Sequence, residues 1–328
     1  MNNYSWLQQK LHKLALSSQF MRETMFDVEK LIFLNQDFQD IGNHVFVAGL
    51  ARSGTTVLLN AIHQSDEFAS LSYDDMPFVL APNLWSRLSG HKNHSDSQER
   101  AHGDGVQVST DSPEAFEEVF WKTFYRGNNN RHFLFKKYVG LILRKYEKKR
   151  YLSKNNQNIR RLEDIHNIFP NGFILIPFRK PLQHAYSLLT QHKKFLKEQK
   201  KDRFMFDYMT WIGHSEFGQG YEPIISFNLK NQNDMHLNHW LEQWYLSYKK
   251  VSELPIEGES FALICYESLC DGPVVWKKIK EQIDVDQNIA FEFRQSKKII
   301  DEDFDEGLLK RCNDLYEDLK VHRAYSQV

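Results

Sequence analysis

The chain has 328 residues, of which 41% are hydrophobic and 14% aromatic, and its formal net charge at pH 7 is -1. This length and apolar content are sufficient for a large globular core, which excludes a disordered or fibrous chain. A nearly neutral chain has no overall electrostatic attraction for nucleic acid or for an anionic membrane, so we expect no nucleic acid among the partners.

The cysteines and the first residues indicate a cytoplasmic location. Cys265, Cys270 and Cys312 have a spacing that fits neither a zinc site nor a disulfide framework, as is usual in a reducing compartment. The first residues lack the apolar segment and cleavage site of a signal peptide, and no stretch approaches the ~18 consecutive apolar residues of a membrane span. We therefore expect a soluble, cytoplasmic protein.

Two amphipathic helices are predicted before the core, within residues 1–40, because apolar residues recur there at helical spacing. HVFVAG (44–49) is a short apolar run that ends in glycine, and TTVLLNAIHQS (55–65) returns to helical spacing. These patterns predict a strand, a tight loop and a helix in direct succession. Residues 86–150 begin with a long stretch rich in Ser, Gly, His and Asp and continue into helical segments, so we expect an inserted loop and helical region.

Strands and helices alternate in the rest of the chain. RYLSK (150–154), FILIPF (173–178) and FALICYE (261–267) are predicted strands, and a helical segment follows each of them. This alternation predicts an α/β fold, namely a parallel sheet of the P-loop type with helices on both faces. No internal repeat or linker is visible, so residues 1–328 are predicted to form a single domain.

The loop between the first strand and its helix resembles a nucleotide-binding motif with one change. Gly49 and Gly54 have the spacing of G-x-x-x-x-G-K-[ST], but Thr55 stands where that motif has lysine, and Arg52 precedes the second glycine by two residues. Backbone N–H groups of such a turn, next to a helix N-terminus, bind an anion whatever the side chains are. The loop is therefore predicted to bind an anion.

The side chains of the loop favour a phosphosulfate over ATP. The terminal group of a triphosphate carries about two negative charges and is bound with Mg²⁺. A terminal sulfuryl group carries one charge and needs less compensation, so Arg52 with the hydroxyls of Ser53, Thr55 and Thr56 is sufficient and no metal is required.

The stretch ARSGTT (51–56), placed after an apolar strand, resembles the 5′-phosphosulfate loop of the sulfotransferases that use 3′-phosphoadenosine 5′-phosphosulfate (PAPS). Relatives with arginine in this loop include the tyrosylprotein sulfotransferases and many bacterial enzymes. The family also has an arginine at the end of a later strand and a serine eight residues further on, and Arg179 and Ser187 match both. The resemblance implies that these two residues bind the 3′-phosphate of PAPS, and that residues 52–56, with Gly54 among them, bind its phosphosulfate.

A third match lies between these two motifs. Lys154, Phe169-Pro170 and Arg179 occur in the order and at the spacing of the tyrosylprotein branch. By resemblance, Lys154 contacts the sulfuryl and bridging oxygens and stabilises the departing phosphate, while Arg52 also stabilises charge as the S–O bond breaks. The resemblance covers about residues 44–75, 150–190 and 261–283.

A carboxylate one helix beyond the loop is the expected general base. SYDDMPF (72–78) offers Asp74 and Asp75 there. Bacterial relatives with Tyr-x-Asp-Met-Pro-Phe at this place favour Asp75, whereas the tyrosylprotein branch has a glutamate slightly earlier, so both remain candidates. Capping of a helix is an equally good explanation for either one taken singly.

Two other functions remain open. A P-loop kinase that uses ATP needs a metal-binding carboxylate at a strand end, and only Glu267 is available for that role. A non-catalytic nucleotide-binding protein could keep the same fold without turnover.

The acceptor is expected to be a carbohydrate or a lipid-linked saccharide, with residues 86–150 on the acceptor side. Residues 126–150 carry nine Lys or Arg and a single acid, Glu147. Such a segment forms a solvated helix face, or it binds an acidic glycan or makes peripheral contact with an anionic membrane.

Overall fold

The computed structural model describes residues 4–34, 42–89, 98–99, 107–108, 114, 116–124, 130–254, 260–286, 289–295 and 298–321. Five strands of this part of the chain form one sheet, and two short ones form an antiparallel pair. The strands of the main sheet are β1 (Val45–Val47), β2 (Phe68–Ala69), β5 (Arg150–Lys154), β6 (Phe173–Phe178) and β7 (Phe261–Cys265), and the pair consists of β3 (Gln98–Glu99) and β4 (Gln107–Val108).

The main sheet is parallel throughout and has the order β2-β5-β1-β6-β7. The short β1 lies in the centre, where Val45 pairs with Leu152 of β5 on one side and with Phe173 of β6 on the other. Its three residues are fully buried, as expected for a parallel strand covered on both faces. The predicted α/β fold with a P-loop type parallel sheet is confirmed.

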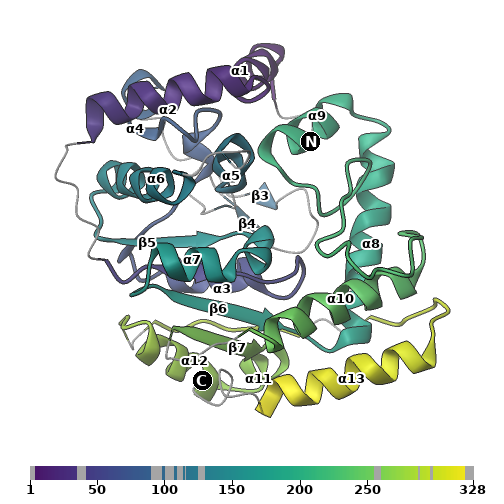
Figure 1. Cartoon of the computed structure of the whole chain (residues 1–328). Helices are drawn as coiled ribbons and strands as arrows, with labels where there is room; N and C mark the ends of the chain where they lie inside the picture. The colour runs from purple at the N-terminus through teal and green to yellow at the C-terminus, as the bar shows by residue number, and fades with distance from the viewer. Residues whose placement is uncertain are drawn as a thin grey trace.

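Helices cover both faces of this sheet (Figure 1). The α-helices of the described residues are α1 (Trp6–Leu16), α2 (Gln19–Phe33), α3 (Thr55–His63), α4 (Pro82–Ser89), α5 (Glu118–Phe124), α6 (Arg131–Tyr146), α7 (Leu162–Ile168), α8 (Pro181–Gln199), α9 (Arg203–Ile212), α10 (Leu237–Ser252), α11 (Tyr266–Cys270), α12 (Pro273–Gln282) and α13 (Glu306–Val321). Two short 3₁₀ helices, η1 (Tyr73–Asp75) and η2 (Asn156–Arg160), follow β2 and β5.

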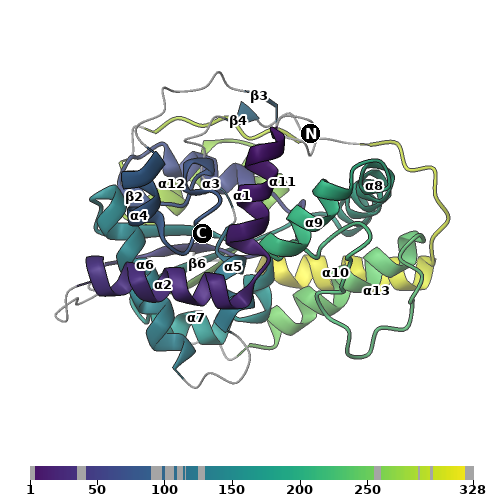
Figure 2. The same ribbon diagram turned by 90° about the horizontal axis from the view of Figure 1, so that it is seen from above.

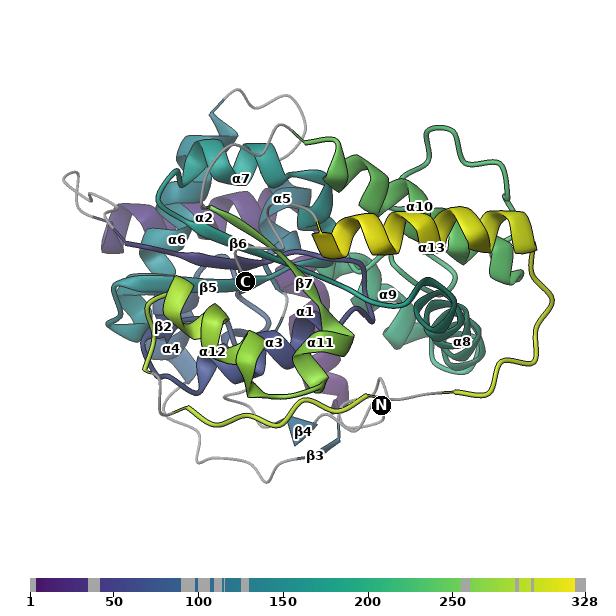
Figure 3. The ribbon, with the colours of Figure 1, turned by 90° about the horizontal axis from the view of Figure 1, so that it is seen from below.

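The two faces of the sheet bury separate clusters of apolar side chains. Val45 and Val47 point to the face covered by α3, α11 and α12, and Phe46 points to the opposite face. Figure 3 shows the strands between these helices on one side and α6 and α7 on the other. Because successive residues of a strand alternate in direction, the three residues of β1 are enough to anchor both layers.

The N-terminal helices are confirmed as α1 and α2, which lie over the outer side of the helical layer (Figure 2). Ser5 begins α1 with a capping box that it forms with Gln8, and Ser18 caps α2. The buried carboxylate of Glu29 on α2 accepts hydrogen bonds from the backbone N–H groups of Asn83 and Leu84 at the start of α4. This contact ties the N-terminal pair to the segment that follows η1.

The region predicted as an insertion, residues 86–150, contains the end of α4 and the helices α5 and α6. Most of the irregular stretch 86–115 lies outside the described residues. The helical segments expected in this region include the basic α6, which packs against α2, α4, α7 and β5. Over the described ranges, none of the helices is both long and apolar enough to span a membrane.

Candidate active site

The loop between β1 and α3 has a backbone shape that only small or strained residues can adopt. Arg52 has φ 69° and Gly54, the N-cap of α3, has φ 105°, both in the left-handed region. A Cβ atom on Gly54 would overlap the ring of Tyr266, and one on Gly49 would lie 3.0 Å from the carbonyl oxygen of Pro177. Both glycines of the motif are therefore required by close approach of neighbouring chain segments.

The hydroxyl residues of the loop differ in their burial. Ser53 is fully buried, Thr55 is buried and donates a hydrogen bond of 3.2 Å to Oδ1 of Asn156, and Thr56 is half-buried in the first turn of α3. Asn156 follows β5 and in turn donates to Glu216 at 3.4 Å. The start of α3 is thus connected to the segment that follows the neighbouring strand.

The two halves of the predicted nucleotide site meet directly. Arg179 follows β6 and donates from Nη1 to the carbonyl oxygen of Arg52 at 3.0 Å, and Nε of Arg52 donates to Oγ of Ser187 on α8 at 3.2 Å. The guanidinium of Arg179 lies 5.3 Å from the centre of the Tyr266 ring. Because β1 and β6 are adjacent parallel strands, their carboxyl ends bring the loop and Arg179 to the same edge of the sheet.

Lys298 is a third cation at this place that the sequence pattern did not indicate. Burial lowers the pKa of Lys298, and the positive charges of Arg52 and Arg179 lower it further. Its backbone is held by Gln183 of α8, which exchanges hydrogen bonds with it at 3.0 and 2.9 Å. Lys298 is exposed overall, and together with Arg52 and Arg179 it forms a positively charged region in which a bound anion is stabilised.

His184 fixes the loop from α8. Its Nε2 lies 2.8 Å from the carbonyl oxygen of Ala51 and donates to it in the neutral ring. Burial, and then the charges of Arg179 and Arg52, lower the pKa of His184 to about 3. His184 therefore stays neutral across the physiological range and adds no charge to the anion site.

This shifted pKa predicts a pH-dependent stability. Below pH 6.5 the unfolded chain protonates His184 while the folded protein does not, so the free energy of unfolding falls by about 1.4 kcal/mol per pH unit between roughly pH 6.5 and 3. Urea denaturation should show that the free energy of unfolding falls between pH 7 and pH 5 by about 2 kcal/mol more in the wild type than in His184→Gln. Equal losses in both proteins would show that His184 is protonated in the folded state.

Lys154 is the last residue of β5 and is aligned with Val47, the residue before the loop. The backbone N–H of Asn155 donates to the carbonyl oxygen of Val47 at 3.2 Å, which fixes this alignment. The side chain of Lys154 is only 4% exposed, and its Nζ lies 3.8 Å from Oε1 of Glu114. Glu114 was missed by sequence analysis, because it lies in the stretch without periodicity and its neighbours gave no motif.

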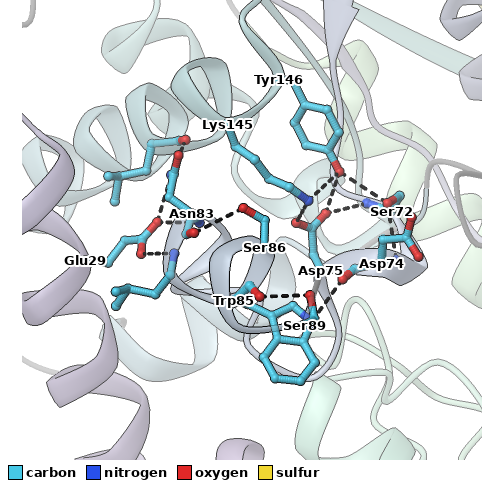
Figure 4. Close-up of polar contacts among 12 residues, drawn as sticks. Glu29, Ser72, Asp74, Asp75, Asn83, Trp85, Ser86, Ser89, Lys145 and Tyr146 are labelled. Carbon is cyan, nitrogen blue, oxygen red and sulfur yellow. Dashed lines mark hydrogen bonds and ion pairs between the residues drawn. The ribbon is translucent and has the colours of Figure 1, made fainter. Parts of the chain in front are cut away.

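Asp75 is fully buried on η1 and is bonded to α6 (Figure 4). Its carboxylate pairs with Nζ of Lys145, accepts from Oη of Tyr146 at 2.7 Å, and accepts from the backbone N–H of Ser72 at 2.8 Å. Ser72 forms a capping box with Asp75, and its hydroxyl also accepts a hydrogen bond from the backbone N–H of Asp74. The side chain of Asp74 belongs to an exposed residue. The backbone carbonyl of Asp74 accepts from Nε1 of Trp85 on α4 at 3.0 Å. The proposed role of either carboxylate as a base stays a prediction.

Glu267, the residue on which a kinase would depend, has structural contacts. Its carboxylate accepts from the backbone N–H of Lys180 at 3.0 Å and from the hydroxyl of Tyr316 at 3.1 Å. It therefore joins the start of α8 to α13 at the end of β7. Across the described ranges, no group of three or more His, Cys, Asp or Glu side chains is placed to hold a metal ion.

Comparison with known proteins agrees with this geometry. The model of the Sulfotransferase family matches residues 44–215, which is more than half of the chain and includes the loop, Lys154, Arg179 and Ser187. The chain belongs to the sulfotransferase family. No curated protein matches its sequence.

The fold of this sulfotransferase resembles solved bacterial structures. Sulfotransferase STF1 from Mycobacterium tuberculosis superposes with a TM-score of 0.51 at 11% identity, over 86% of this chain and 78% of that one. Sulfotransferase STF9 from Mycobacterium avium gives a TM-score of 0.46 at 12% identity, over 97% of this chain and 79% of that one. At such identities the likeness to STF1 concerns the fold alone.

Proposed function

We propose that this sulfotransferase transfers the sulfuryl group of PAPS to a hydroxyl, or an amine, of an acceptor. The observation that carries the proposal is the contact between Arg179 and the backbone of Arg52, which joins two anion-binding groups in one place. One group is the glycine loop at the N-terminus of α3. The other is formed by Arg179, Ser187 and Lys298. A nucleotide with anions on both its 3′ and 5′ oxygens is complementary to this pair.

In this proposal the loop residues Arg52, Ser53, Gly54, Thr55 and Thr56 bind the 5′-phosphosulfate through backbone N–H groups and hydroxyls.

The 3′-phosphate then lies against Arg179, Ser187 and Lys298. Bound phosphate replaces the mutual repulsion of these cations by charge-assisted hydrogen bonds. ATP has no 3′-phosphate and would leave this repulsion in place.

The transfer step needs three contributions from the chain. The acceptor oxygen attacks sulfur in line, the bond between sulfur and the bridging oxygen breaks, and the electron pair leaves with 3′-phosphoadenosine 5′-phosphate (PAP). Lys154 and Arg52 stabilise the charge that grows on the bridging oxygen. A carboxylate takes the acceptor proton, and Asp74 and Asp75 are the residues that the sequence suggests for it. No metal is required for a sulfuryl group of single charge.

A saccharide or lipid-linked saccharide is the proposed acceptor. A cavity of about 710 Å³ is lined by Glu118 and Trp121 from the predicted acceptor-side region, together with Gln157 and Arg160. Among the described residues, the side-chain nitrogen of Gln157 is buried without a hydrogen-bond partner. Trp121 is only 1% exposed, so a sugar ring would lie against the half-buried ring of Phe206, which lines the same cavity beside several polar groups. The basic α6 and a cytoplasmic location would allow peripheral contact with an anionic membrane that carries such an acceptor.

Binding and transfer can be measured separately. Calorimetry should show PAP binding that does not need Mg²⁺ and that is much tighter than the binding of 5′-AMP. Incubation with [³⁵S]PAPS and the polysaccharide, lipid and protein fractions of cells that make the protein should label the first or the second fraction. Activity with ATP and Mg²⁺ but none with PAPS would replace the proposal by a kinase. PAP binding without any labelling would support a non-catalytic nucleotide-binding protein.

A further inference from the structure

Glu114 and Lys154 form an ion pair inside the protein, at the end of β5. Both side chains are 4% exposed, and Oε1 of Glu114 lies 3.8 Å from Nζ of Lys154. The hydroxyl of Tyr73 donates to Oε2 of Glu114 at 3.1 Å, and the backbone N–H of Glu114 donates to the carbonyl oxygen of Leu71 at 2.9 Å. Glu114 therefore has a fixed position beside the lysine that borders the loop.

The separation of this pair is unusual for a buried structural contact. Burying two charges is costly, and the attraction offsets that cost only when the geometry is close and the remaining oxygens are bonded. A tight charge-assisted contact is about 2.7–2.9 Å long. The neighbouring pair of Arg161 and Glu118 is that close, with Nη2 of Arg161 at 2.6 and 2.8 Å from the two carboxylate oxygens. At 3.8 Å, Glu114 and Lys154 attract each other but are too far apart for a direct hydrogen bond.

Glu117, three residues further on, shows what a structural carboxylate looks like in the same segment. It is buried and accepts hydrogen bonds from Trp121 at 2.8 Å, Asn158 at 2.9 Å, Tyr151 at 3.2 Å and Ser153. These donors satisfy both of its oxygens and attach α5 to β5. Glu114 differs from Glu117 in that its partners include Lys154, the residue proposed to act on the bridging oxygen.

Position also distinguishes Glu114 from the two aspartates. Asp75 is enclosed by Lys145, Tyr146 and the N–H of Ser72, on the side of α6. Glu114 lies within 4 Å of Lys154, which is aligned with the last residue before the loop. A base must come within about 2.6–3.2 Å of the proton that it takes, close to the transferring group.

We propose that Glu114 is the catalytic base, an assignment that rests on the proposed function. The acceptor O–H gives its proton to a carboxylate oxygen of Glu114 while its oxygen forms the new bond to sulfur. The bond from sulfur to the bridging oxygen breaks, and PAP leaves with the electron pair beside Lys154. The hydroxyl of Tyr73 donates to the second carboxylate oxygen, and Tyr208 is a further titratable group that the charge of Glu114 affects.

The test compares Glu114→Gln, Glu114→Asp, Asp74→Asn and Asp75→Asn with the exposed control Glu163→Gln on α7. PAP formed from PAPS is measured between pH 5 and 9 with a lysate of cells that make the protein as the source of acceptor. PAP affinity is measured by calorimetry on the same proteins. Glu114→Gln should lower kcat about 100-fold or more and remove the fall in activity at acidic pH, which is the acidic limb of the pH profile. Its affinity for PAP should stay within about threefold of the wild-type value. Glu114→Asp should recover part of the rate together with that limb.

Three results would overturn the assignment. The first is a Glu114→Gln variant whose pH profile of activity keeps its acidic limb. The second is loss of that limb in Asp74→Asn or Asp75→Asn instead. A fall in PAP affinity and melting temperature that Glu114→Asp does not reverse would show a structural ion pair. Failure of the wild type to bind PAP or to consume PAPS would instead overturn the proposed function, and the two failures are therefore distinguishable.

Discussion

Replacing Arg179 by alanine should weaken the binding of PAP about 100-fold and leave the weaker binding of 5′-AMP within about threefold. The guanidinium is proposed to contact only the 3′-phosphate, and loss of a charge-assisted contact of about 2.7 kcal/mol corresponds to that factor. Ser187→Ala should show the same selectivity with a smaller effect, of about five- to tenfold. Isothermal titration calorimetry with both nucleotides measures this directly.

The exposed Arg203 on α9 supplies the matched control, since Arg203→Ala removes the same charge far from the loop. Arg179 also donates to the backbone of Arg52, so its loss could disturb the loop itself. In that case PAP and 5′-AMP would lose affinity by the same factor. Such a result would contradict a role in recognising the 3′-phosphate and would assign Arg179 to loop geometry alone.

Replacing Lys154 by methionine should reduce turnover about 100- to 1,000-fold while PAP affinity changes less than about threefold. The positive charge is proposed to act on the bridging oxygen, where negative charge increases only as the S–O bond breaks, so it stabilises the transition state more than the bound donor. Single-turnover transfer of the label from [³⁵S]PAPS to the acceptor gives the rate, and calorimetry gives the affinity. A loss confined to affinity would remove the catalytic role of Lys154.

Methionine at this position also removes the partner of the buried Glu114. The melting temperature of Lys154→Met should therefore be compared with that of the double variant Lys154→Met/Glu114→Gln. Restored stability in the double variant would show that the isolated carboxylate causes the loss of stability in Lys154→Met. Turnover is compared only between Lys154→Met and the wild type, because Glu114 is itself the proposed base. Lys249→Met on the solvent-exposed side of α10 is the control for removal of a lysine charge.

The meeting of Arg52 with Arg179 was predictable from the sequence because it follows from strand order. Two apolar runs, each followed by a helix, predict parallel strands, and the carboxyl ends of such strands lie at one edge of the sheet. Lys154 ends the strand on the other side of β1, so it comes to the same edge. The resemblance to the family's motifs singled out these three residues, and the strand order observed in the structure explains why they meet.

Glu114 and Lys298 were not predictable in this way. Each lies in a segment without helical or strand periodicity, and each reaches the site through tertiary contacts, with Lys154 and with Gln183. Only some of the contacts of Asp75 could be predicted from the sequence. Ser72 and Asp75 have the spacing of a capping box, but the pairing with Lys145 depends on how α6 packs.

The ring of Tyr266 against Gly54 means that the nucleotide loop cannot be separated from the last third of the chain. Tyr266 directly follows β7, and β7 pairs with β6 over five residues. Tyr266 and β7 lie beyond residue 215, where the family match ends. A fragment cut at that boundary would lose the edge strand and the aromatic support of the turn. A fragment that keeps an intact nucleotide loop must therefore extend at least through Tyr266 at the start of α11.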